Sequence, residues 1–174
     1  HFDTEQGLWH CQKVFKRVYD MDSTIDPSSY HTFGLRAVSH KERIQFIEHY
    51  LSKKIDTPSL VIIDGIADLV SDVNNIEETN AVVQKLMEWS AKYNCHIINV
   101  IHQNYGSAKM TGHLGSFLEK KCETHIELEA NTVNKEWITV KCKRSRGYAF
   151  ETFSFQVNER GLPIMVNNLY DPLK

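Results

Sequence analysis

The sequence contains no long apolar run, because its apolar stretches extend over only a few residues. A membrane-spanning helix needs about 20 consecutive apolar residues, so no segment is predicted to cross a membrane. An excess of one charge is also missing, since 20 Lys and Arg residues and 22 Asp and Glu residues leave a net charge of −2. Nucleic-acid binding is therefore not expected from global charge and would need a local patch.

Cysteine is sparse and scattered. None of the four cysteines belongs to a C-x-x-C pair, and they lie far apart at Cys11, Cys95, Cys122 and Cys142. This spacing argues against a structural zinc site and against a disulfide framework. Free cysteines fit a reducing compartment, so we expect a cytoplasmic protein.

The sequence does contain an alternation of helical and strand patterns. Hydrophobic residues make up 41% of the 174 residues, which predicts one globular domain. Helices are predicted over residues 7–19, 75–93 and 115–122, and after a capping box formed by Ser39 and Glu42. Strands are predicted over residues 1–4, 31–38, 59–63 and 96–101.

From Thr124 onward the pattern becomes β-rich. The segments HIELEA, WITVKCK and FETFSFQV predict three strands, partly antiparallel, that extend the sheet. The predicted fold class is therefore α/β, with a mostly parallel sheet and antiparallel C-terminal strands.

Three of the predicted strands end in polar residues. Residues 3–6 read DTEQ, the apolar run LVII is followed by Asp64, and residues 102–104 read HQN. Ligands of open α/β sheets bind at the carboxyl ends of the strands. If these strands are neighbours, their polar ends converge on one site.

The order and spacing of these segments resemble the RecA-like P-loop ATPase core, and within it the hexameric DNA helicases of plasmid and mobile-element replication. The resemblance covers most of residues 1–157 and implies a three-layer sandwich. It implies that Asp64 ends the Walker B strand and holds Mg²⁺ beside the phosphates of ATP, with Gly65 leaving room for the nucleotide. The alternative is that Asp64 is an ordinary strand-end residue that starts a turn.

The same resemblance assigns roles to the other two strand ends. It implies that Glu5 activates or positions the attacking water, whereas the alternative is an N-cap or first-turn acid favoured by the helix dipole. It implies that Gln103 senses the γ-phosphate and that His102 shares this role. The alternative for His102 is a packed or solvent-facing histidine at a strand end.

Two basic or aromatic segments are predicted to face DNA or a neighbouring subunit. In the glycine-bearing segment at residues 103–115, the resemblance implies that Tyr105 stacks on a base of single-stranded DNA and Lys109 meets a phosphate. The alternative is a plain loop.

Residues 140–147 read VKCKRSRG. The resemblance implies that Arg144 or Arg146 reaches the nucleotide bound by a neighbouring subunit, with Lys143 or Lys141 as the companion residue. The alternative is a solvated basic hairpin or a nucleic-acid patch.

One motif of the family is missing, because no glycine of this sequence is followed by lysine and no G-x-x-x-x-G-K-[ST] occurs. That motif supplies backbone N–H groups and a lysine to the phosphates. In the family it lies just upstream of the strand ending in DTEQ. We therefore expect residues 1–174 to be a partial RecA-like ATPase domain that is inactive alone.

The sequence thus predicts part of a DNA helicase or replication ATPase that hydrolyses ATP with Mg²⁺ and acts on DNA as a homo-oligomeric, hexameric ring. One alternative is a RecA-like recombinase or clock-type ATPase that does not unwind DNA. Another is a non-catalytic module that binds nucleic acid or a partner through its basic segments. A third is an unrelated α/β domain whose motifs arise by chance.

Overall fold

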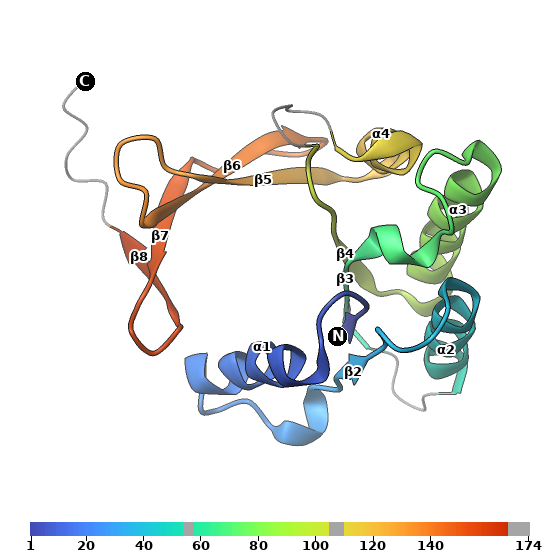
Figure 1. Cartoon of the computed structure of the whole chain (residues 1–174), viewed down its shortest axis with the longest axis horizontal. Coiled ribbons are helices and arrows are strands. Elements are labelled where there is room, and N and C mark those ends of the chain that lie inside the picture. Colours follow the sequence, from blue (N-terminus) through green and yellow to red (C-terminus); the bar gives the residue numbers. More distant parts are fainter. Residues whose placement is uncertain (54–57, 105–109, 167–174) are drawn as a thin grey trace. The chain divides into compact units, whose positions relative to one another are not determined.

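The computed structural model describes residues 1–53, 58–104 and 110–166. The chain divides into two compact units, His1–Lys121 and Cys122–Lys174, and each is described by itself (Figure 1). Within the described ranges, no helix has the length and apolar character that a membrane crossing requires.

The first unit is built on a four-stranded parallel sheet in the order β2-β1-β3-β4. Its strands are β1 (Phe2–Asp3), β2 (Phe33–Gly34), β3 (Leu60–Asp64) and β4 (His96–Val100). In the strand register, Asp3 pairs with Asp64, and Asp64 pairs with Val100. The three polar strand ends predicted from the sequence therefore lie on adjacent strands. The strand predicted over residues 31–38 is much shorter than expected.

Helices lie on both sides of this sheet, with α1 on one side and α2 and α3 on the other (Figure 1). They are α1 (Leu8–Met21), α2 (His40–Lys53), α3 (Ile76–Tyr93) and α4 (Gly112–Lys121), with two 3-10 turns, η1 (Pro27–Ser29) and η2 (Ile66–Leu69). The capping box is confirmed, because the Ser39 N–H donates to Glu42 Oε2 at 2.8 Å and the Glu42 N–H donates to the Ser39 hydroxyl at 3.4 Å. This pair satisfies donors at the start of α2.

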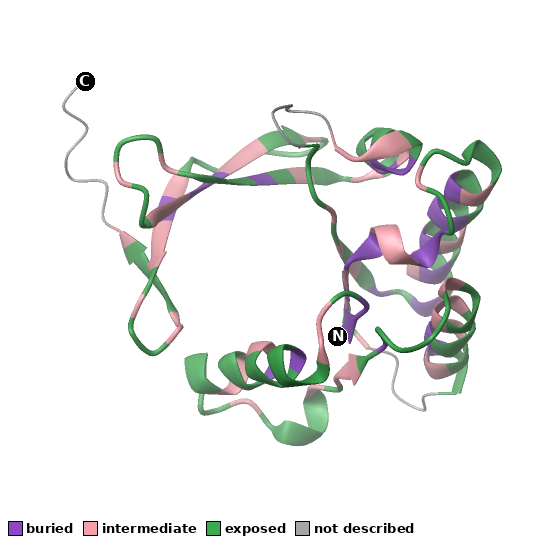
Figure 2. Ribbon diagram, in the orientation of Figure 1, coloured by how far each residue is buried: buried purple, intermediate pink, exposed green. Residues whose placement is uncertain are grey.

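The core explains why an apolar run leads directly to Asp64. Val61 and Ile63 of β3 are buried together with residues of α2 and α3, among them Ile47 and Trp89. Figure 2 shows buried stretches on α3 and on the η2 turn. The positions of β3 that face α2 and α3 are therefore apolar and buried, whereas Leu60 is 48% exposed, and Asp64 follows where the strand leaves the core.

The second unit is a four-stranded antiparallel sheet in the order β5-β6-β7-β8. Its strands are β5 (Thr124–Ala130), β6 (Trp137–Ser145), β7 (Phe153–Val157) and β8 (Pro163–Val166). The three predicted strands are present, but the expectation that they extend the parallel sheet is wrong for the described residues. Short connections favour antiparallel pairing between consecutive strands, which here form their own sheet with β8 added at the edge.

Candidate active site at the carboxyl ends of the parallel strands

A cavity of about 160 Å³ lies at the carboxyl ends of β1, β3 and β4. It is lined by Glu5, Gly65, Ala67, Asp68, Val100, Ile101 and His102. Two of the residues predicted from the sequence, Glu5 and His102, line this cavity directly, and Asp64 directly precedes the lining residue Gly65. The predicted convergence of three strand ends is therefore present in the structure.

The segment after β1 holds Glu5 beside this cavity. The Asp3 carboxylate, which is fully buried, accepts hydrogen bonds from the Glu5 N–H at 3.1 Å and the Gln6 N–H at 2.8 Å. The Glu5 side chain itself is 49% exposed. The N-cap alternative for Glu5 is wrong, because Gly7 is the N-cap of α1 and the first turn of that helix contains no acidic residue.

Thr4 joins the ends of β1 and β3, a role that sequence reasoning missed. Its side chain is buried, and its hydroxyl lies 2.9 Å from the Asp64 carbonyl, 2.8 Å from the Gly65 carbonyl and 3.1 Å from Asp68 Oδ2. Gly65 has a left-handed backbone with φ of 93°, which turns the chain directly behind Asp64. No signal in DTEQ distinguishes this threonine from an ordinary turn residue.

Asp68 and Arg43 were also missed. Asp68 lines the cavity, and its place four residues after Asp64 in IDGIAD was the available signal. Arg43 of α2 donates from Nη1 to the Asp68 carbonyl at 2.7 Å, and from Nε to the Leu35 carbonyl at 3.1 Å. This arginine therefore connects the segment after β3 to the segment after β2 through hydrogen bonds.

Asp64 lies in a negatively charged, half-buried environment. Burial raises the pKa of its carboxyl, and the charges of Asp3 and Glu5 raise it further, whereas His102 opposes them. A bound cation would relieve both effects, so the residues fit a divalent metal. No group of three metal-ligating side chains with suitable placement occurs among the described residues. A site based on Asp64 therefore suits Mg²⁺, which keeps several waters and binds substrate phosphates.

Replacing Asp64 with Asn is expected to stabilise the protein at neutral pH. A carboxyl whose pKa is raised on folding contributes stability below its unfolded-state pKa, and this contribution is lost as pH rises through the folded-state pKa. Asp64→Asn removes the buried charge, so its gain in the free energy of unfolding should be present at about pH 7 and shrink towards about pH 3. Urea denaturation at both pH values measures this. Equal gains for Asp64→Asn and the surface control Asp20→Asn would contradict it.

At the end of β4, His102 faces Glu5. Its Nε2 lies 3.1 Å from Glu5 Oε2 and 3.2 Å from Glu5 Oε1, although the His102 side chain is 75% exposed. The backbone of Gln103 forms an isolated antiparallel bridge with Met110. The sensor role of Gln103 stays a prediction. Tyr105 and Lys109, the predicted DNA contacts, lie outside the described residues.

The predicted basic strand end lies on β6 of the second unit. Lys141 forms an ion pair with Glu129, and Lys143 Nζ lies 3.0 Å from Glu127 Oε2. Both glutamates belong to β5, so these two lysine charges are balanced across the sheet. Arg144 and Arg146 have exposed side chains, and their role as fingers stays a prediction.

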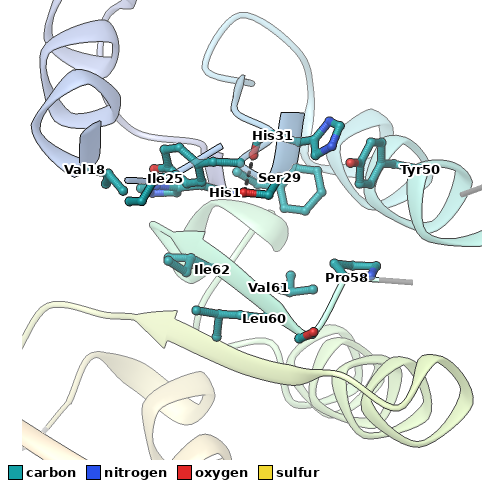
Figure 3. Close-up of a pocket in the computed structure, with 13 residues that line it drawn as sticks. His1, Val18, Ile25, Ser29, His31, Tyr50, Pro58, Leu60, Val61 and Ile62 are labelled. Atoms are coloured by element: carbon teal, nitrogen blue, oxygen red, sulfur yellow. Dashed lines mark hydrogen bonds between the residues drawn. The ribbon is translucent and has the colours of Figure 1, made fainter. Parts of the chain in front are cut away.

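A larger cavity of about 380 Å³ lies beside the first residues of β3, at the amino ends of the parallel strands. Figure 3 shows Val61 and Ile62 on one side of it and His1 and Tyr50 on the other. None of its described lining residues is an Asp or a Glu. The groups that the predicted chemistry needs are at the opposite edge, so we assign the candidate site to the smaller cavity.

No protein-family model and no curated protein sequence matches the chain. Solved structures do resemble it. A solved structure of an ATPase domain aligns with a TM-score of 0.63 at 12% identity, over 95% of this chain and 73% of that chain. The RadB recombinase aligns with a TM-score of 0.59 at 18% identity, over 92% of this chain and 75% of that chain. These matches confirm a RecA-like α/β fold.

Proposed function

We propose that this chain is part of an ATP-dependent DNA helicase or replication ATPase of plasmid or mobile-element type. The observation that carries this proposal is the meeting of Glu5, Asp64 and His102 at one edge of a RecA-like sheet. The fold alone is shared by ATPases with different functions, so the site residues must carry the argument.

The proposal gives a chemical role to these three residues and to the other predicted site residues. Asp64 holds Mg²⁺, directly or through a water, because its half-buried carboxylate lies near the negative charges of Asp3 and Glu5, which a cation would offset. A metal held by Asp64 would supply positive charge to offset that of the transferred phosphate. Glu5, exposed at the cavity, accepts a proton from the attacking water or orients it. Gln103 and His102 sense the terminal phosphate. Arg144 or Arg146 of a neighbouring subunit, together with Lys143, stabilises the charge on that phosphate.

The proposal includes two partners. One is a second copy of the chain within a hexameric ring, because a finger residue acts on a neighbour's nucleotide. The other is single-stranded DNA, which Tyr105 and Lys109 contact through stacking and charge. A recombinase or clock-type ATPase uses the same site without unwinding DNA, and strand displacement by the full-length protein separates these functions.

Metal binding at Asp64 tests the proposal on this chain. Mn²⁺ added together with ATP should broaden the backbone amide NMR signals of residues near Asp64 and Glu5, because a paramagnetic ion relaxes nearby nuclei. Asp64→Asn should weaken this effect about tenfold or more, since it removes the charged ligand. Asp20→Asn, a surface acid on α1, should leave it unchanged. Equal broadening in Asp64→Asn and the unmodified chain would refute the metal site.

A non-catalytic binding module is the second candidate. One observation favours it: exposed arginines lie at the end of β6. Such a module would bind DNA through the second unit without needing Mg²⁺. DNA affinity that survives Asp64→Asn and is lost in Arg144→Ala, with no metal binding, would favour this function.

A further inference from the structure

The position of Glu5 depends on contacts from two different residues. Asp3 accepts hydrogen bonds from the N–H groups of Glu5 and Gln6, so it sets the backbone of this segment. His102 contacts both oxygens of the Glu5 carboxylate through Nε2, so it sets the side chain. Asp3 is fully buried, whereas the contact between His102 and Glu5 is exposed. The side chain is therefore the more adjustable part.

His102 is itself held from the other side of the loop that follows β4. The Thr111 hydroxyl donates to the His102 carbonyl at 2.8 Å, and the Thr111 N–H donates to the same oxygen at 3.3 Å. Thr111 directly precedes α4, whose residue Leu114 donates its N–H to the Val73 carbonyl at 3.1 Å. The backbone of His102 is thus anchored to the start of α4.

The packing at the start of α4 leaves little room for this anchor to move. A Cβ placed on Gly115 would lie 2.4 Å from Met110 Cβ and 2.9 Å from the Met110 carbonyl carbon. Met110 pairs with Gln103, the residue next to His102. Met110, directly before Thr111, is therefore in close contact with Gly115 of α4 and paired with Gln103.

We propose that His102 is a positioning residue that directs the Glu5 carboxylate in the ligand-free protein, and that Thr111 fixes His102 for this task. In this arrangement the Nε2–H group donates to the carboxylate, which requires a proton on Nε2 of the ring. Both side chains line the same cavity of about 160 Å³. The importance of this contact for catalysis rests on the proposed function.

The contact can be measured without metal or nucleotide. Long-range ¹H–¹⁵N NMR spectra distinguish the two neutral tautomers of each of the nine histidines, and loss of one set of signals in His102→Gln identifies His102. Among the neutral forms of the His102 ring, the Nε2–H tautomer should dominate. Glu5→Ala should change the tautomer ratio of His102 about threefold, because the loss of one solvent-exposed ion pair has an effect of that size.

Two matched variants make this result specific. Asp68→Asn changes another carboxylate of the same cavity that does not contact His102, so the His102 signals should stay unchanged. Thr111→Val removes the hydroxyl and keeps the N–H, and should shift the ratio in the same direction as Glu5→Ala, whereas Thr111→Ser should restore it. Unchanged His102 signals in Glu5→Ala would overturn the proposal. Because this readout needs no ligand, it is independent of whether Mn²⁺ binds at Asp64.

Discussion

Gly65→Ala is expected to lower the free energy of unfolding by roughly 2–5 kcal/mol, the largest loss for a single added methyl group at this site. Gly65 has a φ of 93°, and an alanine in that conformation costs about 1–2 kcal/mol. The added Cβ would lie 2.5 Å from the Thr4 hydroxyl oxygen and 3.2 Å from Asp68 Oδ2. Thr4 is buried, so moving its hydroxyl removes hydrogen bonds that no water replaces, at a further cost of about 1–3 kcal/mol.

Urea denaturation followed by circular dichroism measures this loss. Gly147→Ala is the matched control, because a Cβ there meets nothing nearer than the Ser145 hydroxyl at 3.9 Å and the residue does not need a left-handed backbone. The control should change stability by less than about 0.5 kcal/mol. Similar effects of the two substitutions would contradict the tight packing of Thr4, Gly65 and Asp68 behind the strand ends.

Much of the fold was predictable because local patterns and tertiary structure agree. The apolar run that ends at Asp64 predicts a strand buried on both faces. The strand β3 is present, but only Val61 and Ile63 on one face are fully buried, whereas Leu60 on the other face is 48% exposed. The Ser39 and Glu42 capping box marks the start of α2 within one residue. The convergence of Glu5, Asp64 and His102 followed from one rule, that parallel strands present their carboxyl ends at the same edge of a sheet.

The connections between these residues were not predictable, because they depend on register and side-chain reach. Thr4 bonds across 60 residues of sequence to the Asp64 carbonyl, and nothing in the local pattern marks that partner. The sequence pattern predicts that Arg43 faces solvent on its helix, yet its guanidinium donates to the Asp68 carbonyl. The separate antiparallel sheet was missed because strand patterns predict strands but do not specify which edge each strand joins.

Glu5→Gln is expected to lower the rate of ATP hydrolysis by roughly 10²–10⁴-fold in the full-length protein, the largest effect on activity. A glutamine is nearly isosteric with Glu5, but its amide cannot accept a proton from the attacking water. The Asp3 carboxylate still holds the backbone at this position, so the fold is retained. Nucleotide binding should be unchanged because the metal is assigned to Asp64.

The most direct measurement is single-turnover hydrolysis of ATP by the full-length protein and its Glu5→Gln variant, with bound nucleotide measured in the same samples. The control is Glu77→Gln, which changes an exposed acid in the first turn of α3. The account predicts equal binding in all three proteins and a loss of hydrolysis in Glu5→Gln alone. Hydrolysis at the unmodified rate by Glu5→Gln, or no hydrolysis by any of the three, would contradict a water-activating site at this edge of the sheet.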